Sequence, residues 1–168
     1  MEIENIREEL KTKLADAERI LVGIGAEWKL GEPEREAEIA KAGEQLRNAL
    51  EGKDHFVIST LTCEELKRLG FESTHTVAPL DVSLTEEQWN NYMNWLARTL
   101  NRRLVILELG EGFMQPTIIR WPFEKTAAIN NKAHLYRVHK TFYQISDEIK
   151  EKATAVKGDS VALFADWN

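Results

Sequence analysis

The sequence predicts an α/β fold: a single Rossmann-like domain over residues 1–168, with a mainly parallel sheet and helices on both faces. Segments with helical periodicity alternate with short apolar runs, which is typical of strand–helix units wound around a parallel sheet. The run 19–24 is apolar without alternation, as expected of a central strand covered on both faces. The run 103–110 is the clearest strand, and it breaks sharply at Gly110.

The first half of the chain opens with an amphipathic helix whose apolar residues recur at helical spacing. A long second helix is expected to end at Gly52, and Gly70 stops a shorter one. In order, the expected elements are a helix at 2–16, a strand at 19–24, a loop at 29–36, a helix at 37–52, a strand at 55–61, a short helix at 63–71 and a short extended piece at 73–80.

The second half opens with a helix cap signal, because Gln88 follows Thr85 by three residues. Pro122 is expected to interrupt a later helical segment, and Asp159 to cap the last helix. The expected elements are a helix at 85–102, a strand at 103–110, an interrupted helix at 117–130, a strand at 133–139, a short helix at 146–153, a small strand at 154–158 and a helix at 159–167. The apolar stripe of the helix at 85–102 comprises Trp89, Tyr92, Met93, Leu96 and Leu100.

Composition excludes several classes of protein. Acidic residues outnumber basic ones by 28 to 22, which argues against a nucleic-acid partner, because such a protein needs a basic face. Cys63 is the only cysteine, so the sequence excludes an internal disulfide and a cysteine-built zinc site. The charged N-terminal segment resembles no signal peptide, and no apolar run is long enough for a membrane span. We expect a cytoplasmic protein with no membrane partner.

Three strand ends carry turns that could face a ligand: Gly23-Ile24-Gly25, Ser59-Thr60-Leu61 and Gly110-Glu111-Gly112. In doubly wound sheets, ligands bind at the carboxyl ends of strands where the strand order reverses. Glycines at such turns let a backbone approach a pyrophosphate, although a tight turn without a ligand uses the same residues. Glu27 argues against a phosphate unless its carboxylate turns to a ribose hydroxyl.

Several side chains are candidates for catalysis. Glu108 and Glu111 could form an acid–base pair, or either could instead pair with Arg120. His75 lies in irregular chain and is the best general-base candidate. Cys63 begins a helix and could be a nucleophile or an inert thiol. The histidines at 55 and 134 begin or lie within strands, so we expect them to be structural.

Four segments, in this order, resemble the sirtuins and cover nearly the whole chain. "ADAERILVGIGAEW" is similar to the helix, strand and phosphate turn that open a sirtuin. "HFVISTLTCEELKRLGF" resembles the strand that bears the family's Asn and Asp. "LVILELGEGFMQPTIIRWPFEK" is close to the corresponding segment of the macrodomain-linked sirtuins, and it is the most specific match. "HLYRVHKTFYQISDEIKEKATAVKGDSVALFADW" is similar to the sirtuin ending.

The resemblance implies that NAD or ADP-ribose binds in the cleft of the sheet, with NAD-dependent deacylation or ADP-ribosyl transfer as the family's activity. It places Gly23, Gly25 and Ala26 at the pyrophosphate, Thr60 at the nicotinamide ribose, Gly110 and Gly112 at the adenosine, and Val138, His139, Asp159 and Ser160 at the adenine side. We add Trp28 and Arg120 to this cofactor-binding set, and we take His75, Glu27 and Glu111 as the catalytic candidates.

The chain departs from the family at its chemical centre. The family's Asn and Asp align with Leu61 and Cys63, and Glu27 replaces the serine of the phosphate turn. His75 is not followed by the family's glycine, and the zinc-binding cysteines and most of their module are absent. No zinc is therefore expected. Losing these polar groups removes transition-state stabilisation, so the standard activity should be lost or altered.

Three hypotheses follow from the sequence. The first is a zinc-free, sirtuin-like protein that binds NAD, ADP-ribose or a related nucleotide. The second is a non-enzymatic scaffold or small-ligand sensor whose cleft is filled by Trp28, Leu61 and Trp121; a cleft blocked by Trp28 would favour it. The third is an enzyme for a non-nucleotide ligand that uses Glu27, Glu111 and Arg120.

Overall fold

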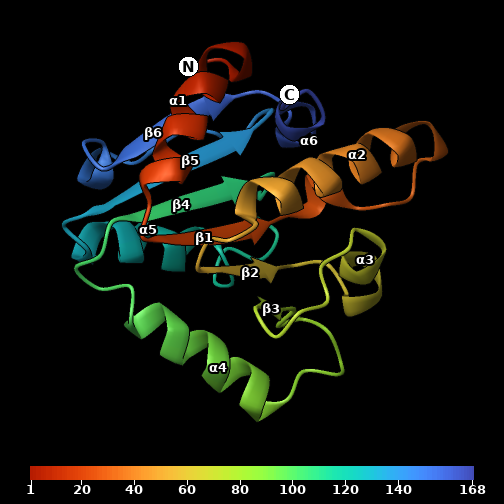
Figure 1. Cartoon of the computed structure of the whole chain (residues 1–168), viewed down its shortest axis with the longest axis horizontal. Coiled ribbons are helices and arrows are strands. Elements are labelled where there is room, and N and C mark those ends of the chain that lie inside the picture. The colour runs from red at the N-terminus through yellow and green to blue at the C-terminus, as the bar shows by residue number, and fades with distance from the viewer.

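A computed structural model describes all 168 residues and has a six-stranded, all-parallel sheet in the order β3-β2-β1-β4-β5-β6 (Figure 1). This confirms the predicted α/β, Rossmann-like fold class. The elements are α1 (Ile3–Asp16), β1 (Arg19–Ile24), the 3-10 turn η1 (Ala26–Trp28), α2 (Pro33–Leu50), β2 (His55–Ser59), α3 (Cys63–Arg68), β3 (Thr76–Val77), α4 (Glu86–Ala97), β4 (Leu104–Leu109), α5 (Arg120–Ile129), β5 (Ala133–His139), the 3-10 turn η2 (Asp147–Ile149), β6 (Ala153–Lys157) and α6 (Ser160–Ala165).

Helices cover the sheet on both faces, and each face has its own apolar core. The helices α1, α2 and α6 pack on one face, and α4 and α5 lie on the other (Figure 1). The first core is built from such residues as Ile6, Leu46 and Phe164, and the second from Tyr92 and Phe123. Burial on both faces explains why β1 and β4 have no polar–apolar alternation.

The two central strands place the candidate site. β1 pairs with β2 on one side and β4 on the other, and Ile24 lies opposite Leu109 at their carboxyl ends. The chain therefore reverses its strand order between β1 and β4, where ligands bind in open α/β sheets. The turns that follow both strands meet at this edge, as the sequence predicts.

Gly23 serves helix packing and does not face this edge. It lies inside β1, and a Cβ added there would sit 2.7 Å from the Ile119 Cγ2 atom and 2.7 Å from the ring of Phe123. The glycine lets α5 approach β1 closely. The expectation that Gly23 faces a pyrophosphate stays a prediction, and the structure gives this glycine a packing role because α5 covers it.

Several element boundaries differ from the prediction. The predicted loop at 29–36 is shorter, because α2 begins at Pro33, where proline suits the first turn of a helix. The predicted helix at 85–102 ends at Ala97, because Asn101 takes a left-handed backbone conformation (φ 64°) that turns the chain into β4. Pro122 does not interrupt α5; it lies in the first turn, where a helix does not use the N–H that proline lacks. The predicted helix at 146–153 is a single 3-10 turn, because β6 begins at Ala153.

The predicted apolar stripe of α4 is only partly buried. Tyr92 is buried as expected, and Trp95, which the stripe omitted, is buried beside it. Trp89 and Met93 are 36% and 44% exposed, because α4 contacts the sheet through a narrower face than the periodicity implies. None of the helices combines the length and the apolar composition that crossing a bilayer requires.

The packing of Gly23 makes a testable prediction. The substitution Gly23→Ala should lower the free energy of unfolding by about 1–3 kcal/mol, because the new methyl group overpacks the interface with α5. Gly31→Ala is the matched control, since nothing lies within 4 Å of its added Cβ. Urea unfolding of both variants measures the difference, and equal midpoints would contradict the prediction.

Candidate functional site

The turns after β1 and β4 touch each other directly. A Cβ added at Gly25 would lie 2.5 Å from the Gly110 carbonyl oxygen and 2.5 Å from the Glu111 Cα atom. The Gly25 N–H also donates a hydrogen bond to the Leu109 carbonyl (2.9 Å). The two backbones occupy the space between the strand ends. Gly25 is therefore required for contact between protein segments, with or without a ligand.

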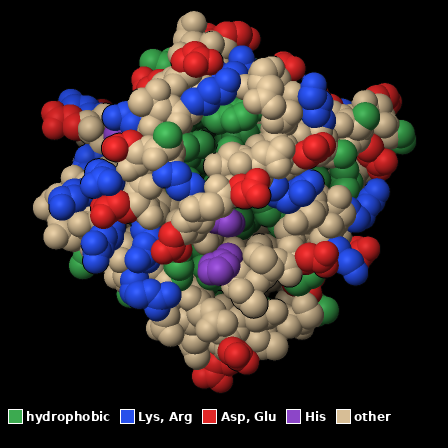
Figure 2. All heavy atoms as spheres, viewed as in Figure 1, with side chains coloured by type: hydrophobic (Ala, Val, Ile, Leu, Met, Phe, Trp, Pro, Cys, Tyr) green, Lys and Arg blue, Asp and Glu red, His purple; other side chains and the backbone are tan.

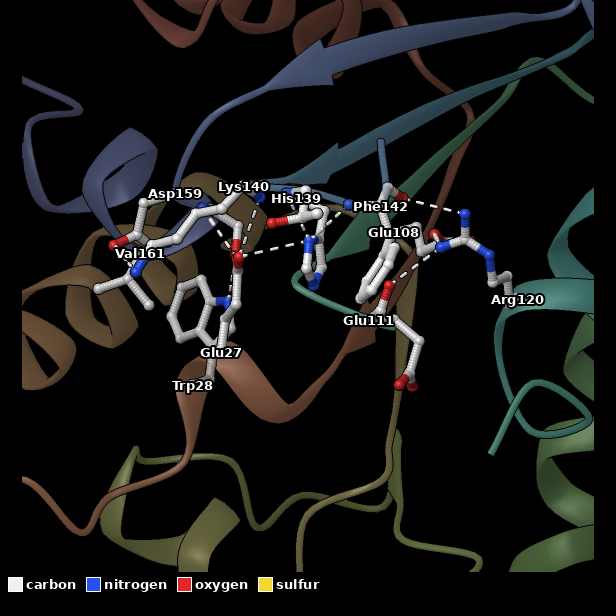
Figure 3. Close-up of polar contacts among 12 residues, drawn as sticks. Glu27, Trp28, Glu108, Glu111, Arg120, His139, Lys140, Phe142, Asp159 and Val161 are labelled. Atoms are coloured by element: carbon white, nitrogen blue, oxygen red, sulfur yellow. Dashed lines mark hydrogen bonds and ion pairs between the residues drawn. The ribbon is translucent and has the colours of Figure 1, made fainter. Parts of the chain in front are cut away.

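The Glu27 carboxylate lies over this contact and is held by donors from two other segments (Figure 3). Its Oε1 atom accepts from the Ser160 hydroxyl (2.7 Å) and from the Ser160 N–H (3.2 Å). Its Oε2 atom accepts from the Lys140 N–H (3.1 Å). Gly110 leaves room for this side chain, because an added Cβ would lie 2.5 Å from the Glu27 Cβ. Glu27 thus ties η1 to the segments after β5 and β6.

Trp28 completes the closure beside Glu27. Its side chain is fully buried, and its Nε1 donates to the Ser160 hydroxyl (2.9 Å). Its ring packs against Phe164 of α6, with the ring centroids 6.3 Å apart. No α-helix starts at the glycine turn: the single 3-10 turn η1 follows Gly25, and α2 begins only at Pro33. The arrangement of a helix N-terminus directly after the first strand, which holds pyrophosphate in dinucleotide-binding folds, is therefore missing.

The cationic groups of this edge gather around Asp159. Its Oδ2 atom lies 2.7 Å from the Arg35 Nη2 and 3.6 Å from the Lys140 Nζ, while its Oδ1 accepts from the Val161 N–H as the predicted cap of α6. His139 lies next to them; burial lowers its pKa, and the Glu27 carboxylate, 3.8 Å away, opposes that shift.

The protonation state of His139 follows from its hydrogen bonds. Its Nδ1 atom accepts from the N–H groups of Thr141 and Phe142, each at 2.9 Å. An atom that accepts two hydrogen bonds carries no proton, so the ring is neutral with its proton on Nε2. A neutral ring next to Glu27 leaves that carboxylate held by hydrogen bonds alone.

Beneath the turn of β4, Glu108 forms a buried ion-pair network. Arg137 of β5 binds it with two contacts, Nε to Oε2 at 2.6 Å and Nη2 to Oε1 at 3.0 Å. Arg120 of α5 adds a longer contact at 3.4 Å, and Arg137 also pairs with Glu124 at 3.0 Å. Burial raises the pKa of Glu108 and the two guanidinium groups lower it. From the sequence, Glu108 is correctly paired with Arg120, but Arg137 is missed. The only sequence feature that points to Arg137 is its position as a cationic residue within an apolar strand.

Arg120 also holds the backbone of this region. Its guanidinium donates to the carbonyl oxygens of Glu111 (3.1 Å) and Phe142 (2.9 Å), and the Phe113 ring lies 4.0 Å from its Cζ. Gly112 lies against the same ring system, since an added Cβ would be 3.4 Å from Phe142. Arg120 therefore positions the β4 turn and has no free donor edge directed at the Glu27 cluster.

Glu111 differs from the other acids of this edge because one of its carboxyl oxygens is buried without a partner. The residue is 3% exposed, and its Oε2 atom is buried without a hydrogen bond. Its side chain points away from Arg120, which binds only its backbone oxygen (Figure 3). Burial, together with the charge of Glu108, raises the pKa of Glu111 to about 7, and hydrogen bonding from Thr60 opposes that rise. This places Glu111 beside Thr60 at the end of β2.

The remaining predicted site residues lie apart from this cluster. His75 precedes β3 at the edge of the sheet and is exposed. The centroid of its ring lies 6.0 Å from that of the His55 ring. Cys63 is exposed at the start of α3, with its Sγ atom 3.5 Å from the Ser83 hydroxyl. Val138 is buried inside β5, and Trp121 is 54% exposed on α5. The structure therefore joins Glu27, Glu111 and Thr60 to one edge but leaves His75 elsewhere.

Leu61 is buried as the second hypothesis expects, whereas Trp121 does not fill the cleft because it faces solvent. His55 and His134 have structural partners, the Lys53 carbonyl (2.9 Å) and the Thr154 hydroxyl (2.8 Å). Across the described chain, no three His, Cys, Asp or Glu residues are grouped so that they could hold a metal ion. Acidic and basic side chains are interspersed over the face seen in Figure 2.

No protein-family model matches the chain, and a search of curated proteins finds no match.

The buried network predicts a strong effect of removing one partner. Arg137→Met should lower the free energy of unfolding by about 3–5 kcal/mol, because Glu108 would keep its burial and lose its bidentate partner. Arg103→Met is the matched control, because that side chain is 55% exposed. Chemical unfolding measures both variants, and a loss at Arg137 no larger than at Arg103 would contradict the assigned network.

The pKa of Glu111 predicts a pH dependence of stability. The folded state keeps the proton up to about pH 7 and the unfolded state loses it near the ordinary value of 4.5. Stability from this group is therefore present at low pH and falls as pH rises through that window. Between about pH 5 and about pH 8, wild type should lose on the order of 2–3 kcal/mol relative to Glu111→Gln. Parallel stability profiles for the two proteins would refute this.

Proposed function

We propose that this chain is a non-catalytic, sirtuin-like sensor domain that binds an NAD- or ADP-ribose-type nucleotide by exchanging the Glu27 carboxylate for a ligand phosphate. The observation that carries the proposal is the set of donors around Glu27. The Ser160 N–H, the Ser160 hydroxyl and the Lys140 N–H converge on one carboxylate at the carboxyl edge of the sheet. Such donors suit any compact anion, and a phosphate oxygen accepts the same hydrogen bonds.

The surroundings of the donors support a larger ligand than phosphate alone. Arg35 and Lys140 contribute cationic groups within 2.7 Å and 3.6 Å of Asp159. Glu111 lies on the same edge with its Oε2 atom buried and unpartnered, so the groups that cover it must move before a ribose hydroxyl can donate to it, as ribose hydroxyls do to acids in dinucleotide-binding folds. Donors for phosphate and an acceptor for ribose are the two groups that an ADP-ribose unit requires.

The proposal excludes the NAD-dependent activity of the sirtuins because of the side chains that follow β2. Leu61 and Cys63 stand where the sirtuin resemblance places the polar groups that hold the nicotinamide end, and Leu61 is buried. His75 lies at the far edge of the sheet and does not approach Glu111 or Glu27. Removing positioned polar groups lowers transition-state stabilisation by orders of magnitude, so binding without NAD cleavage is expected.

A second candidate is a protein scaffold whose cleft stays closed. It is favoured by the complete burial of Trp28 and by the direct contact of the two glycine turns. The third hypothesis, an enzyme for a non-nucleotide ligand, has less support, because the Glu27 carboxylate and both terminal nitrogens of Arg120 are already bound to protein partners. The first two candidates differ in whether freeing the donors creates a binding site.

The test is a calorimetric titration of wild type and Glu27→Ala with ADP-ribose, NAD, AMP and inorganic phosphate. Glu27→Ala should bind ADP-ribose at least about tenfold more tightly, or about 1.4 kcal/mol, because the intramolecular carboxylate no longer competes. Glu44→Ala is the control, since it removes the same charge from an exposed site on α2. Nicotinamide release from NAD should stay at background in every protein.

Each arm of this experiment has a distinct meaning. Phosphate binding as tight as ADP-ribose binding would reduce the site to a simple anion site. Nicotinamide release above background would overturn the non-catalytic assignment. No binding by either wild type or Glu27→Ala at millimolar nucleotide would overturn the proposal and leave the scaffold.

A further inference from the structure

A cavity of about 480 Å³ lies between α4 and α5, on the face of the sheet opposite to α1, α2 and α6. Its walls are mainly apolar, and α4 and the turn after it supply Trp89, Met93 and Leu100, while Ile129 faces them from α5. Its volume falls within the range of small-molecule pockets. None of these residues belongs to the cluster around Glu27, so the cavity is a separate feature of the fold.

The apolar walls of this cavity are left open by the way α4 packs. The helix contacts the sheet through Tyr92 and Trp95, whose rings lie 5.2 Å and 5.7 Å from that of Phe56. The neighbouring face therefore remains in contact with solvent, and Leu100 and Ile129 are 57% and 60% exposed. A contiguous exposed apolar surface that lines a concave site is typical of a binding site.

One charged group in the walls, Lys125, defines the chemistry of an occupant, whereas the Tyr92 hydroxyl is buried beneath the surface of the cavity. Tyr92 lines the cavity, and its hydroxyl is buried without any hydrogen-bond partner. Burial raises the pKa of this phenol, so it remains a hydrogen-bond donor. Lys125 is the only charged residue among the lining residues, and it forms no ion pair within the described chain. Lys125 is exposed and carries the only charge among the lining residues, so it favours an anionic group in an occupant.

We propose that the cavity between α4 and α5 binds a medium-chain carboxylate, with the alkyl chain along the apolar walls and the carboxylate paired with Lys125. An aliphatic chain of about ten carbons fits a cavity of this volume. The Lys125 ammonium group favours a free carboxylate over a neutral lipid or an alcohol.

The experiment titrates the purified protein with octanoate, decanoate and decanol below their aggregation concentrations. Decanoate should bind saturably, and octanoate about tenfold more weakly, because two fewer methylenes are buried. Lys125→Met should weaken decanoate binding about threefold to tenfold and leave decanol binding unchanged. Lys132→Met, at an exposed site outside the cavity, is the matched control.

A second variant tests the location. Ala97→Phe places a ring into the cavity from an exposed position of α4, so the fold should tolerate it while binding of both ligands is lost. Decanoate binding that survives Ala97→Phe, or that is absent in wild type below about millimolar concentration, overturns the proposal. Sedimentation that shows a wild-type dimer dispersed by Ala97→Phe also overturns it, because a second copy of the chain would then cover the cavity.

Discussion

The contact between Gly25 and the backbone of Gly110 and Glu111 is the constraint on which the rest of this edge depends. It brings the turns after β1 and β4 together where the strand order reverses. Glu27 can then reach across Gly110 to Ser160 and Lys140, and Trp28 can follow it into the core beside α6. A larger residue at either glycine would separate the two turns and leave the Glu27 carboxylate without its donors.

Polar groups beneath these turns give the edge its rigidity. Arg137 and Arg120 share the Glu108 carboxylate, and Arg120 also fixes the carbonyls of the β4 turn and of the segment after β5. Fully paired buried networks hold their members in one arrangement. Glu111 stands outside this network although it adjoins it, and the charge of Glu108 contributes to its raised pKa. One acid of the sequence pair is thus part of the ion-pair network, and the other is buried with a raised pKa that favours its protonated form.

Sequence periodicity was sufficient for the fold, because burial on one or two faces leaves a regular pattern in β1, β4 and the helices. Periodicity could not decide whether the glycines make room for a ligand or for another part of the chain. A glycine that admits a pyrophosphate and a glycine that admits another turn have the same sequence signature, and Gly23 proved to lie under Ile119 and Phe123. Arg137 was missed because its partner Glu108 is 29 residues away and only strand pairing brings the two together.

The attachment of Glu27 to the chain has a consequence for selectivity. A carboxylate tethered beside its donors competes at an effective concentration of about millimolar or above, whatever the concentration of anions in solution. A dilute ion that makes a single contact cannot compete with a carboxylate at that effective concentration. Only a ligand that gains further contacts on the same edge, for example at Glu111, exceeds this threshold. The site would then discriminate against small anions because the competing Glu27 carboxylate is part of the same chain, and it would need no pocket that selects ligands by shape.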